Sequence, residues 1–167
     1  MFRLLRRTIR SPRGDVFERT YVSTPGAVGV VAVTPDNHLV LVSQYRSTFD
    51  DYVLEIPAGM RDVAGEDPAR TAWRELAEET GYIPGTVEHL GSCLSSPGIT
   101  DSVVELFFAR NVAAGDSAPE GPEELEMSVL LVPFSDALTM VDRGEITDAK
   151  SVIGILLAAR RFHDLGL

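Results

Sequence analysis

Residues 66–82 read Glu-Asp-Pro-Ala-Arg-Thr-Ala-Trp-Arg-Glu-Leu-Ala-Glu-Glu-Thr-Gly-Tyr and carry the clearest helix signal in the chain. Asp67 is a candidate N-cap, Pro68 suits the first helical position, and Gly81 suits the end of a helix. We therefore expect a helix over residues 67–80. Helical spacing also predicts the residues of its core-facing stripe, with Trp73 buried among them: Ala69, Ala72, Trp73, Leu76 and Thr80.

The polar face of this helix concentrates negative charge. Glu75, Glu78 and Glu79 stand at positions i, i+3 and i+4, so their carboxylates crowd on one side. Each like-charge pair at this spacing costs about 0.2–0.5 kcal/mol on an isolated helix, and the helix dipole disfavours anions near the C-terminal end. A divalent cation such as Mg²⁺ would relieve the repulsion and still leave positions for water and phosphate oxygens. The alternative is an ordinary solvated acidic face.

The rest of the chain alternates strand-like and helix-like segments. The turn-forming residues 34–38 are expected to join the strands at 27–33 and 39–45 into a hairpin. Residues 113–124 are rich in small residues and acids and are expected to be a mobile loop. Apolar, β-branched runs predict strands at residues 27–33, 39–45, 52–56, 87–94, 103–109 and 127–132. Helices are expected at about 135–143 and 148–162. This order predicts a mixed α/β (α+β) fold, with a mixed sheet and helices on both faces.

Charge is distributed unevenly along the chain. Residues 1–14 contain five arginines and no acid, and the remaining residues hold ten basic and 25 acidic side chains, a net charge of −15. We expect the basic start to form a β-hairpin, with a turn at 11–15 before a strand at 16–22, rather than a transit peptide. Because residues 15–167 are this acidic, they should repel nucleic-acid polymers, but they can bind a small anion through bridging cations.

Other global features exclude further classes of protein. No apolar run approaches the roughly 18–20 residues that a membrane helix needs, so no membrane contact is expected. Cys93 is the only cysteine, which excludes an intrachain disulfide and a cysteine-based zinc site and favours a partly buried apolar role. We therefore expect a cytoplasmic protein in a reducing compartment.

A longer motif surrounds the first helix. Gly59 is followed by six residues, Glu66, seven residues and then Arg74-Glu-Leu-Ala-Glu-Glu-Thr-Gly-Tyr82. This resembles the Nudix box, G-x5-E-x7-R-E-U-x-E-E-x-G-U with U apolar, and every position from Glu66 onward matches in type. One residue is added between Gly59 and Glu66, so Met60 takes the nominal glycine position. The addition leaves the spacing of the helix acids unchanged.

Four further stretches resemble the ADP-ribose pyrophosphatase branch of the Nudix hydrolases. They are Gln44-Tyr-Arg46, Pro57-Ala-Gly59, Ser96-Pro-Gly98 and the segment 144–150. Pro97 lies 16 residues past Gly81, where the branch carries a marker proline. Ser102 stands where the branch often has an acid, which leaves the substrate open.

The resemblance implies a role for individual residues. Glu75 and Glu79 would be the core Mg²⁺ ligands, with Glu78 a partner and the Ala58 carbonyl a further donor; Mn²⁺ is a possible substitute. Arg74 would pair with an acid of the helix. The general base is expected in the loop at Glu123 or Glu124, and the residues leave that choice open.

The resemblance also implies the contacts of the substrate. Arg46 is the candidate for a phosphate or ribose contact, and Pro97 and Gly98 belong to the expected substrate loop. Tyr21, Phe17 and Phe49 could stack on adenine, but core packing is the favoured interpretation for each.

The implied protein is a Nudix hydrolase with an α/β/α sandwich at residues 26–167 and a β-hairpin arm at residues 1–25 that forms a homodimer. The implied reaction is Mg²⁺-dependent hydrolysis of ADP-ribose to AMP and ribose 5-phosphate. Two alternatives remain. One is a Nudix hydrolase for another nucleoside diphosphate derivative, such as NADH or a nucleotide sugar. The other is a non-catalytic nucleotide sensor, which the presence of all three box acids disfavours.

Overall fold

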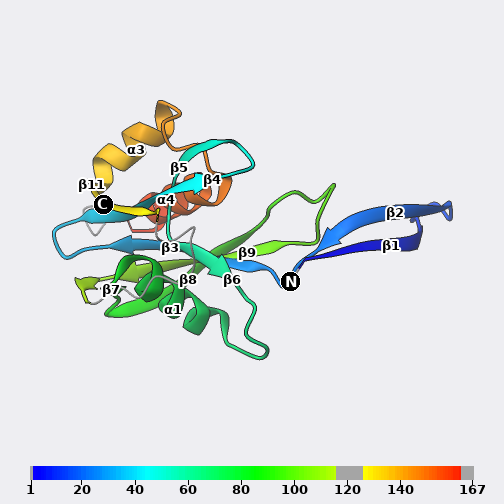
Figure 1. The fold of residues 1–167 in the computed structure, drawn as a ribbon, viewed down its shortest axis with the longest axis horizontal. Helices are drawn as coiled ribbons and strands as arrows, with labels where there is room; N and C mark the ends of the chain where they lie inside the picture. The colour runs from blue at the N-terminus through cyan, green and yellow to red at the C-terminus, as the bar shows by residue number, and fades with distance from the viewer. Residues whose placement is uncertain (1, 116–125, 163–167) are drawn as a thin grey trace.

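A mixed β-sheet forms the centre of the molecule in this computed structural model, which describes residues 2–115 and 126–162 (Figure 1). The sheet runs in the order β11-β4-β3-β9-β8, and β5 pairs with β4 while β6 pairs with β3. Its strands are β3 (Ala27–Val33), β4 (His38–Arg46), β5 (Asp51–Glu55), β6 (Ala58–Met60), β8 (Thr86–Leu94), β9 (Val103–Arg110) and β11 (Ser128–Pro133). The described helices are α1 (Pro68–Thr80), α3 (Phe134–Asp142) and α4 (Ala149–Arg161).

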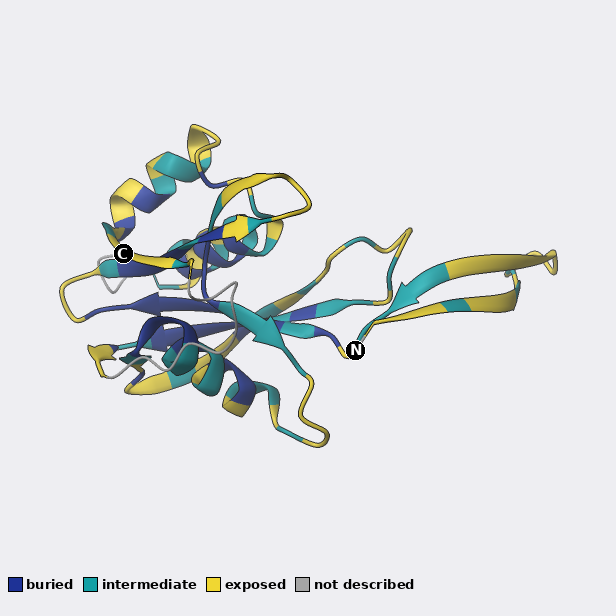
Figure 2. Ribbon diagram, viewed as in Figure 1, coloured by how far each residue is buried: buried dark blue, intermediate teal, exposed yellow. Residues whose placement is uncertain are grey.

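Helices cover both faces of this sheet, as predicted. Successive side chains of β3 point to opposite faces, so Val28 and Val30 pack with Leu76 of α1, whereas Val31 packs in the core that contains Ile155 of α4. Burial on both faces explains why β3 is apolar at nearly every position rather than alternating. Figure 2 shows the result as a buried strand between exposed outer surfaces. The architecture is the expected α/β/α sandwich.

The hairpin of β3 and β4 opens away from its turn. The two strands pair only at Ala32–Val40 and Val33–Leu39. Beyond that point β5 pairs with β4 and β6 pairs with β3, so the segment between β5 and β6 enters the gap. A hydrogen bond from the Val30 amide to the Pro57 carbonyl, 2.9 Å long, anchors that segment. The gap places the ends of β5 and β6 next to α1 and α4, where the candidate site lies.

Three local predictions were wrong. Trp73 is 42% exposed, because it lies about 100° round the helix from Ala72 and at the edge of the stripe that packs on the sheet. Strand β6 was missed, since a three-residue strand has no readable periodicity. Residues 113–124 were expected to be a loop throughout, but β10 (Ala113–Ala114) pairs with β7 (Tyr82–Ile83). Residues 116–125 lie outside the described part of the chain.

The N-terminal hairpin stands away from the sandwich, as Figure 1 shows. It consists of β1 (Arg3–Arg10) and β2 (Val16–Ser23), joined by the predicted turn, in which Gly14 has a φ of +94°. Its base is attached through Asp101, whose carboxylate accepts hydrogen bonds from the Ser23 hydroxyl at 2.8 Å and the Thr24 amide at 3.0 Å. Most of its surface is exposed (Figure 2). Within residues 2–115 and 126–162, no helix has the length and apolar character to span a membrane.

Candidate active site

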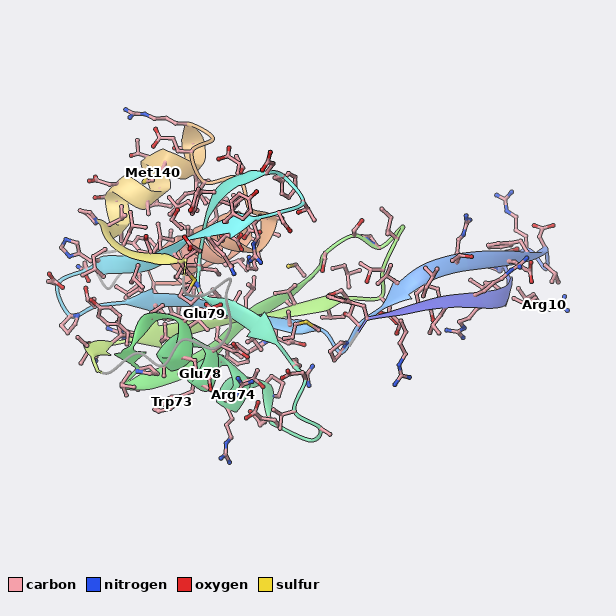
Figure 3. The ribbon with its side chains drawn as sticks, viewed as in Figure 1. Arg10, Trp73, Arg74, Glu78, Glu79 and Met140 are labelled. Atoms are coloured by element: carbon pink, nitrogen blue, oxygen red, sulfur yellow. The ribbon has the colours of Figure 1, made fainter. Side chains whose placement is uncertain are left out.

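Helix α1 carries the acidic residues of the site, and local interactions set its ends. The Asp67 side chain accepts a hydrogen bond from the Ala69 amide at 2.9 Å, as an N-cap does. Gly81 ends the helix in the left-handed conformation, with a φ of +72°. Because Glu75, Glu78 and Glu79 are three and four positions apart, the helix places them on one side. Figure 3 shows Arg74, Glu78 and Glu79 on this helix.

Strand β6 lies against the acidic face of α1. The Ala58 amide donates a hydrogen bond of 2.9 Å to Oε2 of Glu79, which is only 9% exposed. Gly59 leaves room for the neighbouring acid: a Cβ atom at this position would lie 1.9 Å from Cδ of Glu75. Position 59 therefore has no room for a side chain while Glu75 keeps this position, and this steric requirement appears only in the packing of β6 on α1.

Arg74 lies at the centre of the acidic cluster. Its guanidinium approaches Glu78 at 2.7 Å, Glu75 at 2.9 Å and Glu66 at 3.4 Å. Burial lowers the pKa of this group, but the carboxylates of Glu75 and Glu78 outweigh that effect and raise it. The predicted pairing of Arg74 with an acid of its own helix is confirmed. Glu66 also accepts a hydrogen bond from Thr71 at 2.9 Å, which suits a structural role.

Glu75 holds its proton more tightly than an ordinary glutamate. Burial is the main cause, and repulsion from Glu78 adds to it, so the pKa of Glu75 rises to about 7 although Arg74 acts in the opposite direction. Near neutral pH this carboxyl group is thus divided between its protonated and ionised forms. A cation bound beside it would favour the ionised form.

A pocket of about 370 Å³ joins these groups, and it also contains Arg46 from β4. Its lining residues are Gln44, Arg46, Ala58, Gly59, Met60, Asp62, Arg74, Glu75, Glu78 and Glu79. We call it the acidic pocket. It brings together all the predicted metal-binding residues, Arg74 and the predicted phosphate contact. Gln44 and Asp62 had not been singled out as site residues.

The donor atoms in the acidic pocket suit a hard divalent cation. Carboxylate and backbone carbonyl oxygens are the ligands that such ions take, and Mg²⁺ commonly uses only one or two carboxylates beside water and substrate phosphates. Across residues 2–115 and 126–162, no group of three His, Cys, Asp or Glu side chains converges as a ready-made site. Arg74 explains this, because it pairs with two of the acids. The carboxylates and the Ala58 carbonyl are nevertheless the kinds of ligand that fit a hard divalent cation.

The remaining substrate-binding candidates lie together in a different pocket. Tyr21, Pro97 and Gly98 line one of about 640 Å³ at the base of the hairpin, together with Phe17. A pocket of about 340 Å³ adjoins the acidic pocket and shares Arg46, Ala58, Gly59 and Met60 with it. It also contains Ser102 and Lys150. The structure therefore brings Tyr21, Pro97 and Gly98 together in one pocket, and Arg46 lines two other pockets instead. Phe17 and Phe49 are 38% and 77% exposed, so the prediction that they pack in the core was wrong.

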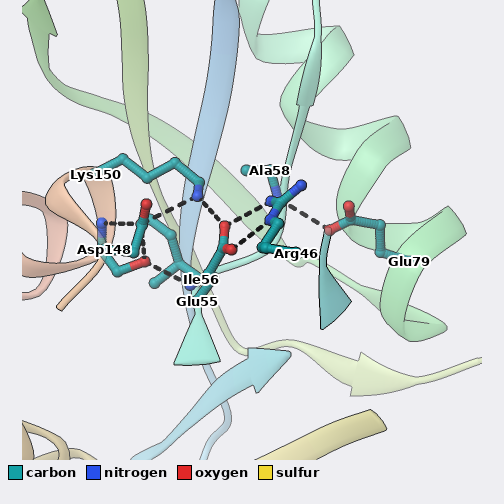
Figure 4. Close-up of polar contacts among 8 residues, drawn as sticks. Arg46, Glu55, Ile56, Ala58, Glu79, Asp148 and Lys150 are labelled. Atoms are coloured by element: carbon teal, nitrogen blue, oxygen red, sulfur yellow. Dashed lines mark hydrogen bonds and ion pairs between the residues drawn. The ribbon is translucent and has the colours of Figure 1, made fainter. Parts of the chain in front are cut away.

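A buried ion-pair network holds Arg46 in place (Figure 4). Glu55, at the end of β5, accepts two hydrogen bonds from the Arg46 guanidinium, at 2.6 and 2.7 Å, and another from Lys150 of α4. Burial raises the pKa of Glu55, but its bonds to Arg46 and Lys150 outweigh this effect and lower it. The sequence analysis assigned no role to Glu55 or Lys150. The sequence signal that could have identified Glu55 is that it is the one acid in the otherwise mostly apolar run 52–56.

Known proteins resemble this chain over most of its length. The profile of the NUDIX domain matches residues 23–153. The methanol dehydrogenase activator of Bacillus methanolicus is 37% identical over 147 residues, which cover 88% of this chain and 79% of the relative. The ADP-ribose pyrophosphatase of Bacillus subtilis (strain 168) is 36% identical with the same coverage. A solved ADP compounds hydrolase, 21% identical, has a TM-score of 0.77 over 99% of this chain and 96% of its own, which shows a common fold.

Proposed function

Because this chain belongs to the Nudix family, as a pyrophosphohydrolase, we propose that it hydrolyses ADP-ribose to AMP and ribose 5-phosphate with Mg²⁺ as its metal. The observation that carries the proposal is the acidic pocket, which is lined by three carboxylates of one helix and by Arg46. A nucleoside diphosphate needs both kinds of charge: carboxylates to hold a cation, and an arginine to bind its phosphate oxygens. The 36% identity to an ADP-ribose pyrophosphatase supports the choice of substrate.

In the proposed mechanism, Glu75, Glu78, Glu79 and the Ala58 carbonyl would hold the cation. When bound, Mg²⁺ supplies positive charge that neutralises the diphosphate and acidifies water; Mn²⁺ can supply the same chemistry. Arg46 binds a phosphate, and Arg74 orients the acids of α1. Water attacks one phosphorus, and the bond from that phosphorus to the bridging oxygen breaks.

The general base that accepts the proton of the attacking water is proposed to be Glu123 or Glu124. Both lie outside the described residues, so this assignment stays a prediction from the sequence. Glu123→Gln and Glu124→Gln test it separately, because each substitution removes one carboxylate at nearly constant size. If neither variant slows hydrolysis, the base lies elsewhere.

A substrate panel tests the proposed function. ADP-ribose, NADH and a nucleotide sugar are incubated with the protein and Mg²⁺, and the products are separated by chromatography. We expect ADP-ribose to have the highest kcat/KM and to yield AMP. A higher kcat/KM for NADH or for the nucleotide sugar would refute the substrate assignment and favour the alternative that Ser102 leaves open. No turnover of any of the three would refute hydrolysis.

Gly59→Ala is expected to lower kcat about a hundredfold without unfolding the protein. A Cβ atom would occupy the position of the Glu75 carboxylate, at 1.9 Å from Cδ, and the flexible side chain would move out of the site. Losses of this size follow when one preorganised electrostatic group is displaced. Gly91→Ala is the matched control, because its Cβ would meet only Leu157 Cδ1, at 3.4 Å. Equal kcat values for the two variants would contradict the role of Gly59.

Mg²⁺ binding is expected to release a proton from Glu75 near neutral pH. Its pKa of about 7 means that the carboxyl group is largely protonated at pH 6 and must ionise to coordinate the metal. Metal affinity should therefore rise with pH up to about 7 and change little above it. Calorimetry at pH 6.5 in two buffers of different ionisation enthalpy measures the release. Identical heats in both buffers would contradict this coupling.

We also propose that the arm, residues 1–25, pairs with a second copy of the chain. Phe2, Leu4 and Val16 of the arm are 65%, 76% and 58% exposed, and an isolated two-stranded hairpin is marginally stable. A second copy would cover these apolar side chains. Sedimentation is expected to show a dimer at micromolar concentration and a monomer after deletion of residues 1–25. A monomeric full-length chain would refute the proposal.

A further inference from the structure

Lys150 is linked to the acidic pocket through Glu55 rather than directly. Glu55 is 3% exposed, and both of its carboxylate oxygens accept a hydrogen bond from Arg46. Lys150 donates to the same oxygen as Nη2 of Arg46. Arg46 lines the acidic pocket, whereas Lys150 does not. Two cations therefore share one buried anion. Arg46 lines both the acidic pocket and the adjoining pocket of about 340 Å³, whereas Lys150 lines only the adjoining one.

Asp148 fixes the position of the Lys150 ammonium. Its Oδ2 accepts a hydrogen bond from Lys150 Nζ at 3.0 Å and caps α4 by accepting another from the Ser151 amide at 2.9 Å. The Ser151 hydroxyl in turn accepts a hydrogen bond from the Ile56 amide at 2.8 Å, directly after Glu55. Figure 4 shows the continuous series from Asp148 through Lys150 and Glu55 to Arg46. The start of α4 is thus tied to the end of β5.

The net charge around Arg46 depends on whether Glu55 pairs with Arg46 alone or with both Arg46 and Lys150. With Arg46 alone, Glu55 would neutralise the guanidinium through a two-pronged ion pair, and the pair would have little net attraction for a phosphate. With Lys150 present, Arg46, Glu55 and Lys150 together carry one net positive charge. Asp148 brings the total of the four groups to zero, but its hydrogen bonds go to Lys150 and Ser151, so the positive charge remains at the Arg46 end of the network. Coulomb interactions are strong at such partly buried positions, so this charge acts on an anion several ångströms away.

We propose that Lys150 is a positioning residue that shares the charge of Glu55 and thereby leaves Arg46 able to bind a phosphate of the substrate. The inference rests on the proposed function for the nature of that substrate. Asp148 has the opposite electrostatic effect, because its carboxylate offsets the ammonium charge. Neutralising Lys150 should therefore weaken phosphate binding, and neutralising Asp148 should strengthen it.

Direct binding measurements test this charge relation. The ligand is the ADP-ribose analogue in which a methylene group replaces the bridging oxygen, and its Kd is measured by calorimetry with Mg²⁺. Lys150→Met is expected to raise Kd about tenfold, the size of one partly screened charge interaction. Asp148→Asn, which retains a good helix cap, is expected to lower Kd two- to threefold. If both variants weaken binding equally, the network has a structural role only and the proposal is overturned.

Two further variants separate charge sharing from other roles of Lys150. Lys150→Arg keeps the charge and should restore Kd to within about twofold of the original protein. In an Arg46→Gln background, Lys150→Met should change Kd less than twofold, because the charge acts through Arg46. A tenfold effect that persists in this background would show direct contact and refute the proposal. Arg143→Met, at an exposed position, is the matched control for loss of a cation.

The binding series also separates this inference from the proposed function. If the original protein binds the analogue and the variants follow the expected order, while ADP-ribose is not hydrolysed, the proposed function fails and the role of Lys150 stands. If ADP-ribose is hydrolysed but Lys150→Met binds the analogue as tightly as the original protein, the role of Lys150 fails alone.

Discussion

Glu79→Gln is expected to lower kcat for ADP-ribose hydrolysis about 10³-fold, the size of losing one preorganised electrostatic group in an active site. Glu79 is the most buried of the three glutamates, at 9% exposure, and faces the acidic pocket. The substitution removes the negative charge that would hold the cation. It should spare the fold, because the amide oxygen of glutamine can still accept the hydrogen bond from the Ala58 amide.

The control for this experiment is Glu88→Gln, the same chemical change at an exposed position of β8. Steady-state rates over a range of Mg²⁺ concentrations distinguish weaker metal binding from slower chemistry. Circular dichroism checks that both variants are folded. Turnover of Glu79→Gln at the rate of the control would refute the assignment of Glu79 as a metal ligand.

Glu55→Gln is expected to lower the free energy of unfolding by about 3 kcal/mol, the usual cost of removing one partner from a buried ion pair. The carboxylate is buried between Arg46 and Lys150, and the neutral amide would leave both cations without their common anion. Because these cations lower the pKa of Glu55, its stabilising effect should persist above pH 4.5 and disappear as the pH falls through the lowered pKa. Urea unfolding at pH 7 and pH 3 measures both effects.

An exposed ion pair provides the comparison for Glu55. Glu18 pairs with Arg6 on the arm, where their side chains are 52% and 69% exposed, and Glu18→Gln should cost less than about 1 kcal/mol. Equal losses of unfolding free energy for the two variants would show that burial contributes nothing to the Glu55 network. A changed denaturant slope would instead indicate an altered unfolded or native state.

The structural features that depend on residues close together in the chain were the most predictable. The helix begins after Asp67 and ends at Gly81 as expected, because caps and turn-to-turn spacing act within a few residues. Strand β3 has the predicted bounds for the same reason. The prediction for Trp73 failed, since helical spacing finds the centre of a buried stripe better than its edge, and packing against the sheet decides how wide the stripe is.

The substrate-binding candidates show a similar limit. Tyr21, Pro97 and Gly98 were chosen separately, and the structure places them in one pocket because the base of the arm pairs with the segment after β8. Arg46 was chosen as a phosphate contact, and its bond to Glu55 appears only when β4 and β5 pair. No local pattern predicts which acid an arginine meets across a sheet.

By itself, the sequence determined the helix and the common direction of Glu75, Glu78 and Glu79, because a helix places residues three and four positions apart on one side. Only the tertiary structure decided what those acids face. Gly59 meets Glu75 because β6 enters the gap between β3 and β4, and Lys150 meets Glu55 across 95 residues because α4 packs beside the end of β5. Contacts of that range depend on strand order and packing, which short sequence patterns do not encode.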